Sequence, residues 1–356
     1  MVAVHIFAEF RRQPNFLIQN KKSGDVVMKK SIFLLVFALF LCLSTQAIAE
    51  VVFSFGHSNP PNDRSQNHFF YLKFAELAKK YSNGEIVINE FPSNQLGGEQ
   101  ARVNKARKQT NLITQASTPN VAPFAPSAGV LSLPYLFNDM DEILSLLNGE
   151  FGTTILSERI RKESGLLVLG YLTTGFRMIT NSKRCVNEIG EMEGLKIRVP
   201  KDAIMLKTFE AWGVNPITMA WPEVFTGLQQ GVIDGQINSY ITNYAASFHE
   251  VQKYITPLSA MPWISPILIS DKGFAKLEPK IQQALLKAAK EAALLEQAWG
   301  VEREKEFQMI LVEKGMVMCS LKDKNIWKEK ARAIWPDLYD KVGGKEIVDQ
   351  ALSYIK

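Results

Sequence analysis

Hydrophobic and polar residues follow two periods along residues 51–116, and together these periods predict alternating strands and helices. Short apolar runs predict strands at 51–55, 86–88 and 112–116. Helices are predicted at 97–108 and at 67–81, where Phe70, Phe74 and Leu77 recur at helical spacing. Strands that alternate with helices are typical of an α/β fold with a largely parallel sheet.

A second series of the same kind begins at Leu166. Strands are predicted at 166–171, 175–180, 194–200 and 232–236, with a short one near Thr218, and helices at 203–212 and 222–230. In the strand at 194–200, apolar residues alternate onto one face, so Lys196 and Arg198 lie on the other. Pro200 ends this strand.

A long helical pattern runs from Pro279, a favourable first helical residue, to Glu313. Six apolar residues are expected to share one face: Ile281, Leu285, Ala288, Ala292, Leu295 and Trp299. One helix of this length can span two lobes, and the alternative is two consecutive helices with a break near Gly300. Because no linker separates the two series, we expect the chain to cross between two lobes more than once.

The composition fits this interpretation and excludes one class of partner. The 356 residues are enough for two domains, and 46% hydrophobic with 22% charged residues is typical of a soluble globular protein. The formal net charge of +5 is concentrated in residues 1–49, which hold six Lys or Arg residues and two acids. No basic patch remains in the rest of the chain, so a nucleic-acid partner is not expected.

Residues 28–49 have the pattern of a secretory signal peptide. Lys29 and Lys30 precede an apolar run of 12 residues at 32–43, and Ala47-Ile48-Ala49 is a small-x-small cleavage site. The run is too short for a membrane span, which needs about 20 apolar residues. We therefore expect cleavage after Ala49 and export to the periplasm, and we interpret residues 1–27 as the product of a misassigned start codon.

Export would leave Cys185 and Cys319 in the mature chain. An oxidising compartment permits a disulfide between them, and the alternative is two separate buried thiols. No catalytic set is evident: the histidines form no HExxH motif, and GxSxG, P-loop and CxxC motifs are absent from the sequence. Neither a metal, a cofactor nor an enzymatic activity is expected.

Arg198 is the strongest candidate for binding chemistry. Ligands of open α/β sheets collect beyond the carboxyl ends of the strands. An arginine there can hold a carboxylate with two parallel hydrogen bonds, which lysine cannot do. On pattern alone, a solvated or structurally paired arginine is the competing interpretation.

Five motifs place Arg198 in a larger pattern. They are NGEIVINEFPSNQLGGE (83–99), LSLPYLF (131–137), GFRMITNSK (175–183), GLKIRVP (194–200) and PEVFTGLQQGVIDGQIN (222–238). From about Val51 to the C-terminus, the chain resembles the solute-binding proteins of TRAP (tripartite ATP-independent periplasmic) transporters, the DctP-like family. The resemblance implies a two-lobed α/β receptor of the periplasmic binding protein fold, with the long helix spanning both lobes.

The resemblance also implies where a small organic acid would bind. Arg198 would hold its carboxylate, Arg177 would approach the same acid, Asn238 would hydrogen-bond it, and Trp221 would cover it. Further candidates are His57, Asn59, Ser117, Thr118 and Tyr240. The chain departs from the family pattern at Gln109–Leu112, and Ser239 with Tyr240 replaces a proline that follows the asparagine in many relatives.

Other roles remain open for some of these residues. Arg177 is alternatively an inter-lobe ion-pair residue, and Trp221 is alternatively core. Trp212 is expected in the core, and Trp263 is a possible pocket residue near the hinge.

The function implied is a periplasmic receptor that closes on a carboxylate and delivers it to the small and large permease subunits in the membrane. We expect a monomer. The first lobe is predicted to hold residues 50–174 with about 263–302, and the second 175–262 with about 303–356. The alternatives are a sensory protein that presents its ligand to a membrane receptor, and an exported enzyme that acts on an acid.

Overall fold

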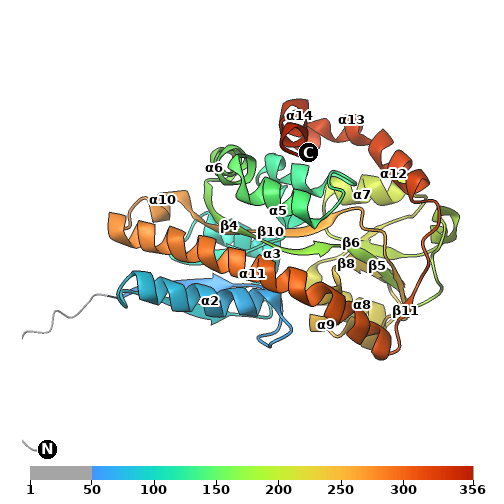
Figure 1. Cartoon of the computed structure of the whole chain (residues 1–356), viewed down its shortest axis with the longest axis horizontal. Coiled ribbons are helices and arrows are strands. Elements are labelled where there is room, and N and C mark those ends of the chain that lie inside the picture. Colours follow the sequence, from blue (N-terminus) through green and yellow to red (C-terminus); the bar gives the residue numbers. More distant parts are fainter. Residues whose placement is uncertain (1–49, 356) are drawn as a thin grey trace, which may run out of the picture. The chain divides into compact units, whose positions relative to one another are not determined.

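The computed structural model describes residues 50–355, so the predicted signal peptide and the start at Met28 lie outside the described residues. Two sheets form the framework of this part of the chain (Figure 1). The first has the order β2-β1-β3-β10-β4, with β1 (Val51–Gly56), β2 (Ile86–Phe91), β3 (Leu112–Gln115), β4 (Leu166–Phe176) and β10 (Pro262–Ser270). The second has the order β11-β9-β5-β8-β6-β7, with β5 (Met178–Asn181), β6 (Ile197–Val199), β7 (Ile217–Thr218), β8 (Gly235–Asn238), β9 (Tyr254–Thr256) and β11 (Val317–Met318).

Helices fill most of the connections between these strands. Before Asp202 they are α2 (Gln66–Tyr81), α3 (Glu99–Ala106), α4 (Thr118–Val121), η1 (Pro126–Ser132), α5 (Met140–Asn148), η2 (Phe151–Leu156), α6 (Ser157–Ser164) and η3 (Ile189–Met192). After it they are α7 (Ala203–Ala211), η4 (Trp221–Glu223), α8 (Val224–Gln229), α9 (Tyr240–Ala245), η5 (Phe248–Glu250), α10 (Asp271–Phe274), α11 (Pro279–Glu313), α12 (Lys324–Ala333), α13 (Trp335–Leu338), η6 (Tyr339–Lys341) and α14 (Lys345–Tyr354). None of the helices in the described range is long and apolar enough to cross a membrane.

The predicted α/β alternation is confirmed where the hydrophobic period was clearest. Phe70, Phe74 and Leu77 of α2 are buried as expected, and the Ser65 hydroxyl caps this helix by accepting the His68 N–H at 3.2 Å. Several boundaries were wrong. The strand predicted at 166–171 continues to Phe176 as β4, the strand predicted at 175–180 is divided at Arg177, and β8 begins at Gly235, three residues later than predicted. Asp234 precedes it because its carboxylate accepts the Lys196 N–H at 2.9 Å and thereby sets the start of pairing with β6.

The chain passes between the two sheets at three places, as expected for a protein without a linker. β4 ends at Phe176 and β5 begins at Met178, so Arg177 alone separates the two sheets at the first crossing. The second crossing joins β9 to β10, and the third is α11. The Arg177 N–H donates to the Met261 carbonyl at 2.8 Å, which ties the first two crossings together.

Helix α11 is continuous over 35 residues, so the alternative of two helices with a break at Gly300 is wrong (Figure 1). Gly300 lies against β4, where a Cβ atom would be 3.1 Å from the Thr173 carbonyl oxygen. Leu295, expected on the buried face, is 40% exposed. Glu296 and Gln297 are buried in its place, because the Glu296 carboxyl accepts the Thr173 N–H and the Gln297 amide donates to the Tyr171 carbonyl.

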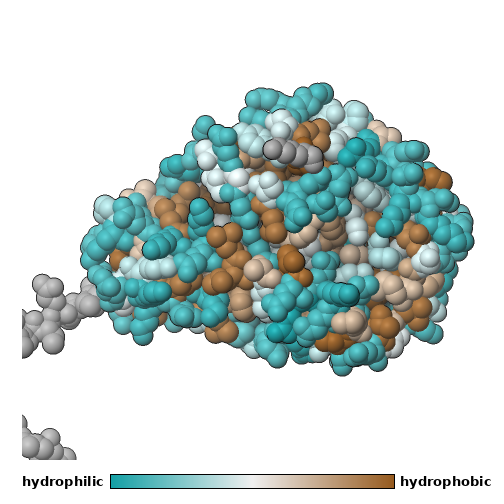
Figure 2. Space-filling view, viewed as in Figure 1, coloured by the Kyte–Doolittle hydropathy of each residue, from teal (hydrophilic) through white to brown (hydrophobic). Residues whose placement is uncertain are grey.

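The solvent-facing side of α11 is not uniformly polar. Leu294, Val301 and Met309 are all exposed on this helix. In Figure 2, viewed as in Figure 1, apolar atoms accordingly lie among the hydrophilic ones on this face of the molecule. Single exposed apolar residues are common on protein surfaces and need no partner to explain them.

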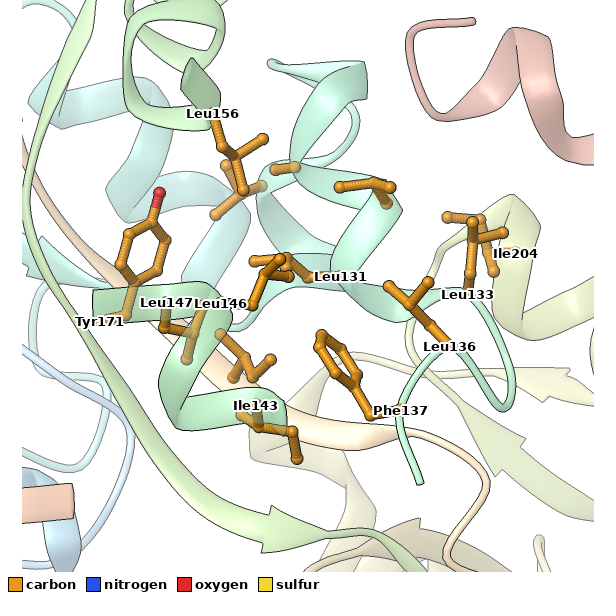
Figure 3. Close-up of a cluster of buried hydrophobic side chains, with 14 of the residues drawn as sticks. Leu131, Leu133, Leu136, Phe137, Ile143, Leu146, Leu147, Leu156, Tyr171 and Ile204 are labelled. Atoms are coloured by element: carbon orange, nitrogen blue, oxygen red, sulfur yellow. The ribbon is translucent and has the colours of Figure 1, made fainter. Parts of the chain in front are cut away.

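The motif LSLPYLF supplies much of one buried cluster. Its residues Leu131, Leu133, Leu136 and Phe137 are at most 2% exposed. Figure 3 shows Leu133 beside Ile204 of α7, which follows β6 of the second sheet. The same apolar motif therefore packs against elements that continue from both sheets.

The predicted lobe boundaries remain predictions. At the C-terminal end, Ile347, Val348 and Ala351 of α14 join the cluster that also holds Leu131. The segment expected in the second lobe thus also packs on η1, which belongs to the segment expected in the first.

Cys185 and Cys319 form a disulfide across 134 residues, with Cα atoms 5.4 Å apart. Of the two alternatives left open by the sequence, the structure has the disulfide. Backbone hydrogen bonds hold the same region: the Cys319 N–H donates to the Ile255 carbonyl at 2.8 Å, and the Ser320 N–H donates to the Asn187 side chain at 3.1 Å. The cross-link thus fixes the chain after α11 to the second sheet.

Replacing Glu296 with Gln is expected to flatten part of the pH dependence of folding stability. Glu296 is fully buried, and burial raises its pKa well above the ordinary value. A raised carboxyl pKa contributes stability that is complete below the unfolded pKa, about 4.3, and is lost as pH rises towards the folded pKa. Glutamine stays neutral and can still accept the Thr173 N–H.

Urea unfolding of both proteins from pH 4 to pH 8 measures this effect. The stability of Glu296→Gln relative to wild type should increase with pH. Taking the difference cancels the opposite contribution of His57, whose pKa is lowered by burial. Parallel curves for the two proteins would contradict the assignment of a neutral buried carboxyl.

Candidate ligand-binding site

A cavity lies beyond the carboxyl ends of β1, β3, β6 and β8. Both sheets contribute to its wall. In open α/β folds, ligands bind at this position, beyond the carboxyl ends of the strands. Its lining residues are Ser58, Asn59, Asn67, Glu99, Ser117, Asn120, Arg177, Arg198, Pro200, Trp221, Asn238, Thr242 and Trp263. Most of these side chains are polar, and two carry a buried guanidinium.

Arg198 reaches the cavity from the middle of β6. Its side chain points to the opposite face from Ile197 and Val199, as the alternation predicted, and it is 3% exposed. Its Nε and Nη2 atoms donate to the Met219 carbonyl at 2.9 and 2.7 Å. Two of its five N–H groups are thereby used, and the Nη1/Nη2 edge keeps the fork that fits a carboxylate.

Arg177 lies beside the same cavity and is 2% exposed. Its Nε donates to the Pro262 carbonyl at 3.2 Å and its Nη1 to the Asn238 side-chain oxygen at 3.0 Å. Its Nη2 is buried without a hydrogen-bond partner in the described chain. A buried donor without an acceptor costs about 1–3 kcal/mol, so Arg177 is poised for an acceptor that enters the cavity.

Asn238 orients Arg177 and is itself held by a buried polar network. Its side-chain oxygen accepts from Arg177, and its amide donates to Gln236 at 2.7 Å. Gln236 in turn donates to Thr180 and Asn243, each at 2.8 Å. The side-chain oxygen of Asn238 is therefore already bonded to Arg177, and one amide N–H of Asn238 remains for a ligand.

The cavity carries a net positive charge, because two buried arginines line it against one carboxylate, that of Glu99. In residues 50–355, none of the ion pairs involves Arg177, Arg198 or the fully buried Arg102. Burial, and then the neighbouring Arg177, lower the pKa of Arg198 to about 9. Burial lowers the pKa of Arg177 to about 10, against the opposing effect of Glu99. All three guanidinium groups stay protonated at neutral pH, and an anion would relieve their mutual repulsion.

Arg102 lies outside the cavity and holds one of its wall residues in position. Its Nη2 donates to the Ser58 hydroxyl at 2.9 Å and to the Gln115 carbonyl at 3.0 Å, and its Nε donates to Thr114 at 3.0 Å. Ser58 lines the cavity, so Arg102 positions a wall residue and adds to the positive field without lining the cavity itself.

Of the three tryptophans with predicted positions, two line the cavity and one lies in the core. Trp221 lines the cavity, with its ring centroid 5.9 Å from the Arg198 guanidinium carbon, and also packs on Phe248. Trp263 lines the cavity as well. Trp212 is 2% exposed and donates to the Trp327 carbonyl at 3.1 Å, so it belongs to the core as predicted.

Three sequence candidates do not line this cavity. The fully buried His57 binds Glu90 at 2.8 Å, because the turn after β1 directs it away from the site. The Thr118 hydroxyl bonds to Ser132 at 2.8 Å. The Tyr240 hydroxyl contacts the Met318 sulfur at 3.8 Å, since α9 begins at this residue and turns it towards β11. Asn59 and Ser117 do line the cavity.

Sequence reasoning missed several wall residues, chiefly Asn67, Glu99, Asn120 and Thr242. Glu99 follows Gly98 at the start of α3 and ends the motif 83–99, which was the available signal. Its carboxylate accepts hydrogen bonds from the hydroxyls of Ser58 and Ser117 and from the Asn120 amide. Asn67 and Thr242 lie near helix starts and carry no separate signal.

No cluster of three or more His, Cys, Asp or Glu side chains that could hold a metal ion occurs in the described part of the chain. Two sheets joined by three crossings, with a polar cationic cavity between them, define a two-lobed solute-binding protein. The chain belongs to the bacterial extracellular solute-binding protein family 7, DctP, whose family model matches residues 55–342.

Individual relatives agree with this family. The 2,3-diketo-L-gulonate-binding periplasmic protein of Escherichia coli K12 is 33% identical over 262 residues, which cover 72% of this chain and 78% of the relative. A TRAP periplasmic solute-binding protein of Rhodobacter sphaeroides, solved in an apo open form, is 38% identical with a TM-score of 0.72, covering 85% of this chain and 98% of that one.

A third relative was solved with a ligand. The sugar acid binding protein DctPAm of Advenella mimigardefordensis, in complex with galactonate, is 27% identical with a TM-score of 0.82, covering 86% of this chain and 98% of that one. These likenesses confirm the resemblance to TRAP solute receptors and the two-lobed α/β fold. The family consists of ligand-binding receptors.

Proposed function

We propose that this chain is the periplasmic receptor of a TRAP transporter and captures a small organic acid by hinge closure. The observation that carries the proposal is the pair of buried guanidinium groups, Arg177 and Arg198, with unpaired N–H groups at one cavity. A carboxylate would bind the Nη1/Nη2 edge of Arg198 and accept from Nη2 of Arg177. The named ligands of two relatives, galactonate and 2,3-diketo-L-gulonate, are also acids.

The three crossings would form the hinge of this closure. A ligand held between the sheets contacts both lobes, so it binds the closed form more tightly and shifts the population towards it. The open apo form of the Rhodobacter relative represents the other end of such a motion. The closed receptor would then deliver the acid to the small and large permease subunits.

Thermal unfolding with paired ligands tests the carboxylate. An acid and its neutral counterpart, such as galactonate and galactitol, differ in one acid group, so within each pair that contains a ligand only the acid should raise the melting temperature. Binding at 100 times the Kd adds about 2.7 kcal/mol of stability, enough for a shift of several degrees. Other sugar acids, dicarboxylates, keto acids and aromatic acids extend the screen. Equal shifts from acids and their neutral counterparts would contradict the proposal.

The remaining parts of the proposal have their own measurements. N-terminal sequencing of the exported protein checks cleavage after Ala49, and light scattering checks the monomer. Incubation with each bound acid, followed by product analysis, checks that the receptor lacks enzymatic turnover. No observation in the described residues favours the sensory receptor or the exported enzyme.

A further inference from the structure

A second, larger cavity adjoins the site. It shares Glu99, Asn120 and Trp221 with the first cavity, so the two spaces have a common wall. Its full lining is Gly98, Glu99, Gln100, Ala101, Asn120, Lys201, Thr218, Met219, Ala220 and Trp221. The start of α3 forms one side, and the segment from β7 to η4 forms the other.

The two cavities differ in chemistry. The first is lined mainly by arginine, asparagine and serine side chains, whereas the second has Ala101 on one side and Met219, Ala220 and Trp221 on the other. Its polar groups include Gln100 and Lys201, and the Gln100 amide donates to the Lys201 carbonyl at 3.4 Å across the gap. The outer space therefore offers an apolar surface beside a polar edge.

The outer wall is coupled to the anchor of the inner site. Met219, which lines the outer cavity, accepts both hydrogen bonds from the Arg198 guanidinium. Trp221, two residues further on, lies over Arg198 and lines both cavities. An acid anchored at Arg198 would thus lie beside Trp221, which also borders the outer cavity.

We propose that the outer cavity is a second subsite that takes the body of the ligand, and that the ligand is an acid with more than four carbons and an apolar edge. The carboxylate lies at the two arginines, and the chain passes Trp221 to contact Met219, Ala220 and Ala101. The proposal rests on the carboxylate function proposed above and specifies the class of acid.

Calorimetry with 2-hydroxybutanoate, 2-hydroxyhexanoate and 2-hydroxyoctanoate tests the subsite, because these probes share one head group and differ in length. In the wild-type protein, affinity should rise by up to about fourfold for each methylene removed from water. Ala101→Trp fills the outer cavity from an exposed helical position. It should weaken the eight-carbon acid at least tenfold and change the four-carbon acid less than twofold.

Two further variants check that the effect of Ala101→Trp comes from filling the outer cavity. Ala220→Phe fills the cavity from its other side and should act in the same direction. Ala298→Trp introduces the same indole at an exposed position of α11, outside both cavities, and should leave all three affinities unchanged. Melting temperatures without ligand verify that each variant is folded.

Failure of the outer subsite and failure of the carboxylate function would give different results. If the four-carbon acid binds and longer acids gain nothing, or if Ala101→Trp weakens short and long acids alike, the outer subsite is overturned while the carboxylate function stands. If none of the three acids and no other acid in the panel binds, both proposals are overturned.

Discussion

Replacing Arg198 with alanine is expected to weaken binding of the acid by about 2–5 kcal/mol, or roughly 30-fold to several thousandfold in Kd. Arg198 is 3% exposed, so the anion would lose a charged donor in a site with little water to replace it. The variant also releases the Met219 carbonyl, to which Arg198 donates twice. Isothermal titration calorimetry with an acid that the wild-type protein binds measures the loss.

Two matched variants locate the cause. Arg198→Lys keeps the charge and removes the planar fork, so much of the affinity should also be lost. Arg303→Ala removes an arginine whose side chain is 41% exposed on α11 and should leave affinity unchanged. Wild-type affinity in a folded Arg198→Ala protein would eliminate Arg198 as the carboxylate anchor.

Removing the disulfide with Cys185→Ser and Cys319→Ser together is expected to lower the free energy of unfolding by about 2–5 kcal/mol. The bond closes a loop with a sequence separation of 134, and cross-linking such a long loop strongly restricts the unfolded chain. Urea unfolding monitored by circular dichroism gives the difference. Neither cysteine lines the ligand cavity, so affinity should be retained.

The single variants Cys185→Ser and Cys319→Ser serve as controls. Each should lose about as much stability as the double variant, since each already abolishes the bond. Reduction of the wild-type protein should reproduce the loss, and the double variant should be insensitive to reductant. A reductant effect that persists in the double variant would show that the change has another origin.

The fold was predictable from sequence where the hydrophobic period was unbroken. α2, β6 and α11 follow directly from it, whereas β10 was missed. Pro262 begins that strand and Pro266 lies within it, and prolines are normally evidence against a central strand. The structure accommodates Pro266 because pairing with β3 starts only at Ile267. The short helices between residues 118 and 164 were also not predicted, since their apolar residues show no long period.

The site was predictable to the extent that its residues stand at strand ends within motifs. Arg177, Arg198, Asn238 and Trp221 all line the cavity. The first-lobe candidates were less accurate, because neighbouring residues in a turn point in different directions. His57 is directed to Glu90 while Asn59 lines the cavity, and sequence position alone does not distinguish them.

The position of Arg177 between β4 and β5 has a mechanical consequence. Its backbone N–H donates to the Met261 carbonyl and its Nε to the Pro262 carbonyl. This residue of the first crossing is therefore hydrogen-bonded to the second crossing. Its outer nitrogen at the same time faces the ligand cavity unpaired. A ligand bound there would act where the two sheets join, so a small change in the angle between the sheets would move their distant edges by a larger distance.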